Sequence, residues 1–84
     1  MIHYQFEREN QRSAAYDEEK CIGECDFEVK NGQWLITHTE VLPSYGGQGI
    51  ARQLVLMVQD QAKKQDVSLV PICSYAVKVL GSPR

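Results

Sequence analysis

The chain lacks any long apolar run, and this absence argues against two classes of protein. No stretch approaches the roughly 18 apolar residues that a membrane-spanning helix needs. The first ten residues, MIHYQFEREN, contain no apolar core of the length found in a secretory signal peptide. The sequence therefore predicts neither an integral membrane protein nor an exported one.

Positive charge is not concentrated anywhere in the sequence. Nine Lys and Arg residues against eleven Asp and Glu residues give a formal net charge of -2, and both signs are spread along the chain. Surfaces that bind nucleic acids or anionic membranes use clusters of Lys and Arg. We therefore expect neither nucleic acid nor a membrane as a partner.

Cysteine is scarce and lacks the spacing of a zinc site. Cys21 and Cys25 do not form a CxxC pair, and no paired histidine follows them. With Cys73 the cysteines number three, an odd count in a chain without an export signal, which favours reduced thiols over disulfides. We predict a cytoplasmic protein with no metal site, in which Cys21 and Cys25 belong to the core.

The first half of the sequence has the two-residue alternation of antiparallel strands. Residues 2–7 alternate apolar with polar side chains, and residues 13–17 follow a polar break as a candidate returning strand. A third run places Cys21, Cys25, Phe27 and Val29 on one face. Asn31-Gly32 joins this run to QWLITHTEVL, and Asn-Gly between two such runs predicts a tight hairpin. The aromatic residues Phe27, Trp34 and Tyr4 are predicted to pack in the core.

The second half changes to a helical period and then returns to a strand. Apolar positions recur at steps of three and four from residue 50 to residue 62, with Lys63 and Lys64 at the expected helix C-terminus. Residues 67–72, VSLVPI, are typical of a strand covered on both faces. Ser74 is a candidate N-cap for a last short helix that stops at Gly81. The order predicts a single α+β domain over residues 1–84: four antiparallel strands, a helix, a parallel fifth strand and a short C-terminal helix.

Gly46, Gly47 and Gly49 fall between the fourth strand and the helix. At such a junction the unpaired N–H groups lie at the positive end of the helix dipole, and glycine lets an anion approach them closely. The alternative is that YGGQG is only a flexible turn. The spacing matches neither GxxxxGK[ST] nor GxGxxG, so a P-loop and a dinucleotide site are both disfavoured.

The segments HTEVLPSYGGQGIARQLV and VPICSYAVKVL resemble the small, single-domain branch of the GNAT acetyltransferases. That superfamily holds the pyrophosphate of acetyl-CoA with a Q/R-x-x-G-x-G/A motif, which falls here on residues 46–51. Gly49 and Ala51 occupy the fourth and sixth positions, whereas Gly46 stands where the family has Gln or Arg. The resemblance implies that acetyl-CoA phosphates contact the loop, whose residues are Gly46, Gly47, Gln48, Gly49, Ile50 and Ala51.

The same resemblance implies that the fourth and fifth strands splay apart. In GNAT folds the pantetheine arm lies in that gap and bonds to the fourth strand, which implies main-chain contacts from Thr39, Val41 and Leu42. Pro71 agrees with a splay, because proline cannot donate a hydrogen bond to a strand ladder.

Four residues are candidates for the chemistry. Glu40 stands where GNAT enzymes often carry a general base, and His38 is a substitute or a proton relay; the alternatives are a solvated charge and a structural histidine. Tyr75 stands where a tyrosine often protonates the departing thiolate, although a packed core tyrosine fits equally well. Cys73 lies between a strand and a helix N-terminus, which suggests an acyl-cysteine relay or a small core residue.

Three functions are compatible with these patterns. The first is transfer of an acetyl group from acetyl-CoA to an amine, on a protein or a small molecule. The second is an acetyl-CoA-binding module without efficient turnover, and the third is an interaction domain whose glycines only turn the chain. Only residues 1–20 precede the predicted hairpin, so the acceptor cleft is expected to be open or completed by another chain.

Overall fold

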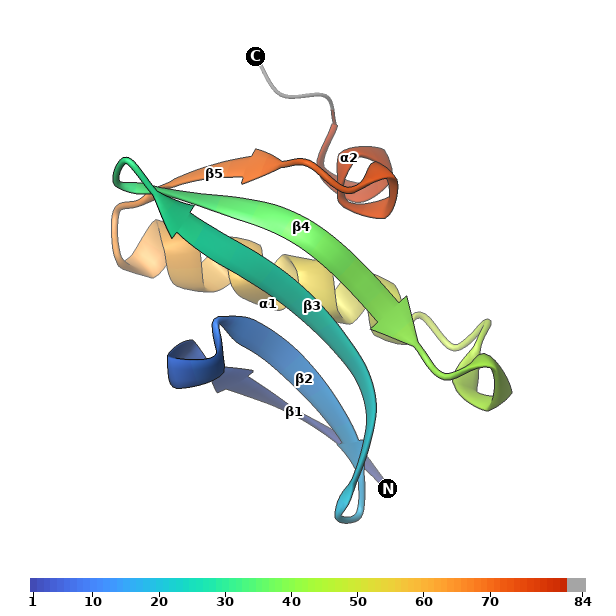
Figure 1. Cartoon of the computed structure of the whole chain (residues 1–84). Helices are drawn as coiled ribbons and strands as arrows, with labels where there is room; N and C mark the ends of the chain where they lie inside the picture. Colours follow the sequence, from blue (N-terminus) through green and yellow to red (C-terminus); the bar gives the residue numbers. More distant parts are fainter. Residues whose placement is uncertain (82–84) are drawn as a thin grey trace.

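The chain folds into one mixed sheet with a long helix along one face (Figure 1). The computed structural model describes residues 1–81. The strands pair in chain order, with β1 to β4 antiparallel and β5 parallel to β4. They are β1 (Ile2–Glu7), β2 (Arg12–Asp17), β3 (Lys20–Lys30), β4 (Gln33–Val41) and β5 (Ser68–Pro71). The helices are α1 (Ile50–Lys64) and α2 (Ser74–Leu80), with 3-10 turns η1 (Arg8–Asn10) and η2 (Pro43–Tyr45). The predicted α+β order is confirmed.

The β3–β4 hairpin forms as Asn31-Gly32 predicts. Asn31 has a φ of 53° and Gly32 a φ of 74°, so both residues are left-handed. This conformation matches the right-handed twist of the strands that the turn joins. The turn thereby fixes the register in which β3 meets β4.

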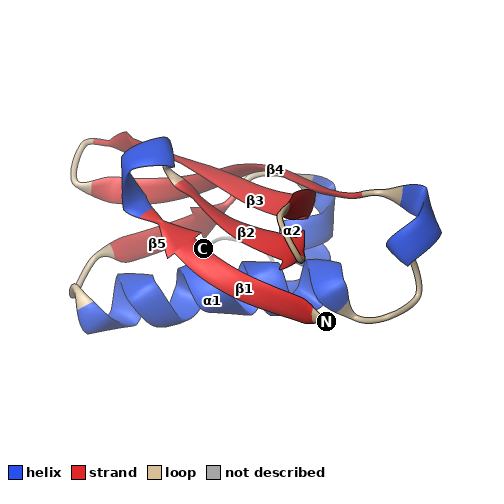
Figure 2. Cartoon of the chain, turned by 90° about the horizontal axis from the view of Figure 1, so that it is seen from below, coloured by secondary structure: helices blue, strands red, loops and turns tan. Residues whose placement is uncertain are grey.

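The apolar core lies between the sheet and α1 (Figure 2). Phe27 and Trp34 stack with their ring centroids 4.4 Å apart, and Phe6 stacks against both rings. Both Phe27 and Trp34 are buried, as predicted, and Tyr4 packs at the edge of the core. The buried residues of α1 are Ile50, Leu54, Val55, Val58 and Ala62.

The prediction that Cys21 belongs to the core is wrong. Its neighbour Ile22 is buried instead, and Cys21 is exposed on the opposite face of the sheet. The cause is a bulge between β2 and β3: Ala15 pairs with Gly23 and Tyr16 with Cys21, so Ile22 is an extra residue. An extra residue reverses the alternation before the bulge, which leaves only Cys25 of the pair in the core. Val29, near the hairpin turn, is 53% exposed.

Two details of the C-terminal segment also differ from the predictions. β5 is a four-residue edge strand rather than a strand covered on both faces, and Ile72 just after it is 55% exposed. The N-cap of α2 is Cys73 and not Ser74, because the Cys73 sulfur accepts the N–H of Ala76 at 3.3 Å. Gly81 ends α2 as predicted, with its N–H donated to the Val77 carbonyl.

The fourth and fifth strands separate half-way along β4. Their pairing runs from Gln33 opposite Ser68 to Ile36 opposite Pro71 and stops there. The N–H groups of Ile72 and Cys73 both bond to the Ile36 carbonyl, at 2.9 and 3.0 Å, as the chain turns away into α2. Within residues 1–81, no strand therefore lies beside residues 37–41 of β4 on that edge (Figure 1). Neither α-helix within residues 1–81 is long and apolar enough to cross a membrane.

Candidate cofactor-binding site

The loop after η2 holds its backbone in conformations that suit glycine. Gly47 and Gly49 have φ angles of 76° and 77°, in the left-handed region. Gly49 is the N-cap of α1 and offers no side chain to its first turn. The first amide of the turn to find a helical acceptor is that of Gln53, bonded to the Gly49 carbonyl at 3.1 Å. No side chain of residues 1–81 therefore caps this turn in the way that Ser, Thr, Asp or Asn does at other helices.

The amides that precede Gln53 are free at the start of the helix. The N–H of Gly46 is bonded to the Pro43 carbonyl at 3.1 Å, but those of residues 47–52 have no acceptor among residues 1–81. Such orphan donors, at the positive end of the helix dipole, bind anions. The Gly46 N–H thus differs from the other N–H groups of the predicted loop, because it is already bonded within the protein.

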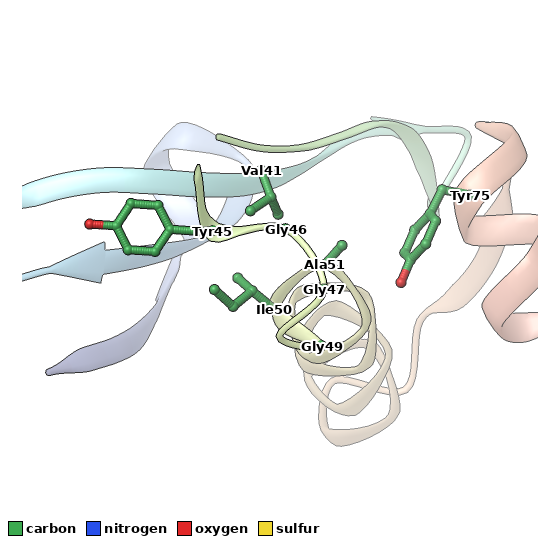
Figure 3. A pocket seen from close by; sticks show the side chains of 8 residues that line it. All are labelled: Val41, Tyr45, Gly46, Gly47, Gly49, Ile50, Ala51 and Tyr75. Carbon is green, nitrogen blue, oxygen red and sulfur yellow. The ribbon is translucent and has the colours of Figure 1, made fainter. Parts of the chain in front are cut away.

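A pocket of about 250 Å³ opens against this loop (Figure 3). Val41 closes it from the end of β4, and Tyr75 faces the loop from α2. The remaining lining residues are Tyr45, Gly46, Gly47, Gly49, Ile50 and Ala51. The pocket thus joins the end of β4 and the glycine loop to the start of α2, which is distant from them in the sequence.

The free edge of β4 presents main-chain groups to the gap beyond β5. The N–H of Leu42 bonds to the Ile22 carbonyl at 2.8 Å, on the β3 side. Because successive residues of a strand point their polar groups to opposite sides, those of Val41 and Thr39 face the gap. The Leu42 carbonyl accepts the N–H of Tyr45 at 2.9 Å, so the Leu42 main chain is engaged within the protein.

Cys73 lies at the inner end of the gap, beside the side chain of Thr39. The Thr39 hydroxyl is 3.5 Å from the Cys73 sulfur and 3.6 Å from the sulfur of Cys25. Burial raises the pKa of Cys25 to about 11, so this thiol stays protonated at neutral pH. Cys73 is only partly buried. Of the two thiols, Cys73 is therefore the one that a ligand in the gap reaches.

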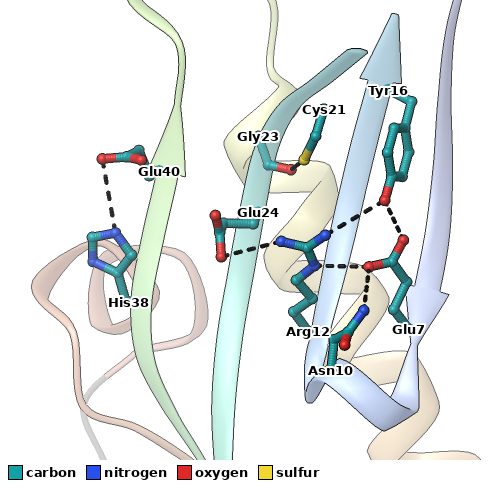
Figure 4. Close-up of polar contacts among 9 residues, drawn as sticks. All are labelled: Glu7, Asn10, Arg12, Tyr16, Cys21, Gly23, Glu24, His38 and Glu40. Atoms are coloured by element: carbon teal, nitrogen blue, oxygen red, sulfur yellow. Dashed lines mark hydrogen bonds and ion pairs between the residues drawn. The ribbon is translucent and has the colours of Figure 1, made fainter. Parts of the chain in front are cut away.

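His38 and Glu40 lie on the face of the sheet opposite α1 (Figure 4). His38 Nε2 is 3.9 Å from Glu40 Oε1, and both side chains are more than half exposed. The two predicted acid–base candidates thus share one face, as their spacing of two residues implies. Figure 1 looks onto this face, and no α-helix of the described chain lies in front of it.

Sequence reasoning missed Asp26, which pairs with His38 across β3 and β4. Partial burial and the neighbouring carboxylate of Glu24 raise the pKa of Asp26 to about 6, against an opposing effect of His38 and Arg12. Arg12 bonds to Glu7 at 2.7 Å and lies 3.6 Å from Glu24 (Figure 4). The spacing of Glu24 and Asp26 placed them on one face, but only the strand register brings His38 and Arg12 to them.

Residues 6–83 match the family model of the GCN5-related N-acetyltransferases. The chain belongs to this family. The match takes in the glycine loop, the whole of β4 and the segment that carries Cys73 and Tyr75. No curated protein matches the sequence significantly.

Solved structures of acetyltransferases have the same fold. AAC(6')-Iy, bound to the bisubstrate analogue CoA-S-monomethyl-acetylneamine, is 21% identical with a TM-score of 0.67, over 87% of this chain and 61% of its own. A probable acetyltransferase from Staphylococcus aureus is 17% identical with a TM-score of 0.70, over 95% of this chain and 85% of its own. Naa50 of Arabidopsis thaliana, bound to CoA-Ac-MVNAL, is 29% identical with a TM-score of 0.56, over 74% of this chain and 45% of its own. The chain thus spans less than two thirds of the length of AAC(6')-Iy and of Naa50.

Proposed function

We propose that the protein transfers an acetyl group from acetyl-CoA to an amine. The observation that carries this proposal is the row of free amides at residues 47–52, beside a gap where β4 has no partner strand. A diphosphate needs the first feature, and an extended amide-containing arm needs the second. Membership of the GCN5-related family supports the same reading.

The cofactor residues follow from which groups are free. Gly47, Gln48, Gly49, Ile50 and Ala51 would hold the diphosphate through their N–H groups. Thr39 and Val41 would bond to the pantetheine arm through main-chain groups that face the gap. Leu42 and Gly46 belong to the same predicted set but contribute mainly contact surface, because the Leu42 main chain and the Gly46 N–H are already bonded.

The outer face supplies the acid–base chemistry in this proposal. Glu40 accepts a proton from the acceptor's ammonium group, either directly or through His38, which is 3.9 Å away. The freed amine then forms a bond to the thioester carbonyl carbon. Both side chains are exposed on a face that no α-helix of residues 1–81 covers, so either a small amine or an amine on a protein surface can reach them.

Tyr75 and Cys73 supply the chemistry at the sulfur. The carbon–sulfur bond breaks as the amide forms, and Tyr75, which lines the pocket, protonates the leaving thiolate through its hydroxyl. The second proton that the amine nitrogen loses as it becomes an amide nitrogen restores the Tyr75 hydroxyl, and the proton on Glu40 passes to solvent. In the acyl-enzyme variant of this mechanism, Cys73 takes the acetyl group first and passes it to the amine. Its position at the inner end of the gap, beside Thr39, is compatible with that role.

The acceptor class is drawn from the relatives. AAC(6')-Iy and Naa50 bind conjugates of CoA with acetylneamine and with Ac-MVNAL respectively. A primary amine is therefore the first acceptor to test, and spermidine and a lysine-containing peptide represent its small and macromolecular forms.

Titration with acetyl-CoA, followed by assay of thiol release, tests the proposal. Binding should shift the amide NMR signals of residues 47–51 saturably, and addition of an amine should release CoA thiol. Glu40→Gln should lower kcat about 100-fold while leaving the Kd for acetyl-CoA unchanged. Mass spectrometry should detect an acetyl group on Cys73, absent from Cys73→Ala, only if the acyl-enzyme variant holds.

Two results would overturn the proposal in different ways. Saturable binding without thiol release for any amine would favour an acetyl-CoA-binding module without turnover. Absence of any shift at residues 47–51 would leave the glycines as a turn in an interaction domain.

A further inference from the structure

Tyr45 connects the glycine loop to the C-terminal end of β2, which lies at the same end of the sheet as the end of β4. It is the last residue of η2, directly before Gly46, and its hydroxyl donates to Asp17 Oδ2 at 2.6 Å. Asp17 ends β2, so the bond joins segments 28 residues apart. Tyr45 is also one of the residues that line the pocket (Figure 3).

The middle of the loop is exposed, and its ends are held by neighbouring residues. Gly46, Gly47, Gln48 and Gly49 are all exposed, and a Cβ on Gly47 or Gly49 would meet no atom of residues 1–81 within 4 Å. Near the C-terminal end of the loop, Ile50 is buried at the start of α1. Within residues 1–81, buried Ile50 thus holds one end of the loop. At the other end, Tyr45 bonds to Asp17, and the Gly46 N–H bonds to the Pro43 carbonyl.

The bond between Tyr45 and Asp17 favours one protonation state of the pair. It lowers the pKa of Asp17, because the hydroxyl donates to the charged carboxylate, and it raises the pKa of Tyr45 for the same reason. At neutral pH the carboxylate is thus charged and the phenol protonated, which is the stronger form of this hydrogen bond. The second oxygen of Asp17 accepts from the Met1 amine at 3.3 Å.

We propose that Tyr45 and Asp17 are positioning residues that pre-organise the loop for the diphosphate of the cofactor. This inference rests on the proposed function and extends it to two residues outside the chemistry. If the loop samples other conformations without the bond, only a fraction of molecules is competent to bind, and the apparent Kd rises by the inverse of that fraction. The bond would act on the diphosphate end alone, because the β4 edge is held by β3.

Calorimetric titration of Tyr45→Phe with CoA and with pantetheine tests the proposal. Tyr45→Phe keeps the ring and removes only the donor, and we expect the Kd for CoA to rise about five- to tenfold. The Kd for pantetheine, which has no diphosphate, should not change. Hydrogen exchange of the amides of residues 47–51 in the unliganded protein should become faster.

Tyr4→Phe is the matched control. Tyr4 lies on β1 at the edge of the core, and its hydroxyl has no hydrogen-bond partner in the described part of the chain. Asp17→Ala and the double variant Asp17→Ala/Tyr45→Phe complete the set. If the two residues act as a pair, the double variant should bind CoA no more weakly than the weaker single variant.

The outcomes separate this inference from the proposed function. If wild-type protein binds CoA and Tyr45→Phe binds it equally well, the positioning role is wrong. Equal weakening of CoA and pantetheine would also contradict it, since that result indicates general damage to the fold. If the wild-type protein does not bind CoA at all, the proposed function fails. Faster exchange of the loop amides in Tyr45→Phe would still support the claim that the bond to Asp17 holds the loop, and unchanged exchange would contradict it.

Discussion

Two glycines, one in the β3–β4 turn and one in the glycine loop, have left-handed backbone conformations that are unfavourable for other amino acids. Gly32 and Gly49 provide a matched pair, because their φ angles are 74° and 77° and neither has an atom within 4 Å of an added Cβ. Gly32 lies in the β3–β4 turn and Gly49 at the start of α1. Alanine at either position is strained by the backbone alone, and only one of the two positions faces the pocket.

We predict that Gly32→Ala and Gly49→Ala cost similar stability but differ in binding. Each should lower the free energy of unfolding by about 1 kcal/mol, because a Cβ is disfavoured in the left-handed region. Only Gly49→Ala should raise the Kd for acetyl-CoA, about tenfold or more. Relief of the backbone strain at residue 49 would shift the neighbouring amides that face the diphosphate. Urea unfolding and calorimetric titration measure the two effects. Equal affinities of the two variants would contradict the site.

Asp26 makes stability depend on pH. Its pKa is raised to about 6 in the folded protein from an ordinary value of 3.8, so the folded state holds this proton more tightly than the unfolded state. The contribution of Asp26 to stability therefore falls as the pH rises from about 4 to about 6. Above that range a partly buried carboxylate stands beside Glu24.

We predict that Asp26→Asn raises the melting temperature at pH 8 and changes it little at pH 4. The amide removes the repulsion from Glu24 and the burial of a charge, both of which exist only at the higher pH. Glu28→Gln, an equal loss of charge at an exposed position of β3, is the control and should shift neither value. Melting curves at the two pH values decide the matter. A uniform shift of Asp26→Asn across pH would mean that its charge is not the cause.

At the scale of elements, the packing of α1 on the sheet determines where the glycine loop lies. Leu54 is fully buried, and its carbonyl accepts the buried hydroxyl of Ser13 at 2.8 Å. A Cβ added to Gly23 would stand 3.2 Å from Leu54 Cδ1 and 3.1 Å from Val41 Cγ2. The helix thus approaches β2, β3 and the end of β4 closely at one level, directly after the loop.

We predict that Leu54→Ala lowers the free energy of unfolding by about 2 to 5 kcal/mol, because it leaves a cavity at this level. The control is Gln53→Ala, an exposed neighbour on α1, with an expected change of less than about 0.5 kcal/mol. Chemical denaturation of both variants gives the comparison. Similar losses for the two would show that the helix is not held by this contact.

Residues 1–81 form one small core and leave the sheet face opposite α1 without an α-helix over it. A domain of 84 residues buries a modest share of its surface, so its stability is expected to be low without a ligand. A ligand in this pocket would contact the loop, the end of β4 and α2 at once. Binding should therefore be visible in the global stability.

We predict that acetyl-CoA at 100 times its Kd raises the free energy of unfolding by about 2.7 kcal/mol. For a domain of this size the melting temperature should rise by about 10 to 20 °C. Thermal unfolding with and without acetyl-CoA measures the shift, and Gly49→Ala at the same concentration should show a smaller one. An unchanged melting temperature at saturating ligand would contradict specific binding to the folded state.

The sequence alone determined the type and order of the elements, the Asn31-Gly32 hairpin and the glycine loop before α1. These follow from local rules, since side-chain period, turn residues and helix ends depend on neighbours in the chain. His38 and Glu40 could be placed on one face for the same reason, because two residues are one period of a strand.

The tertiary structure decided what depends on register and on distant contacts. A bulge opposite Ala15 and Tyr16 buried Ile22 in place of Cys21, and no local pattern marks that extra residue. The bond from Tyr45 to Asp17 and the pairing of Asp26 with His38 join residues from different strands and loops. Such contacts form only once the strands have paired in their final register. That register depends on the packing of the whole core and not on neighbours in the chain.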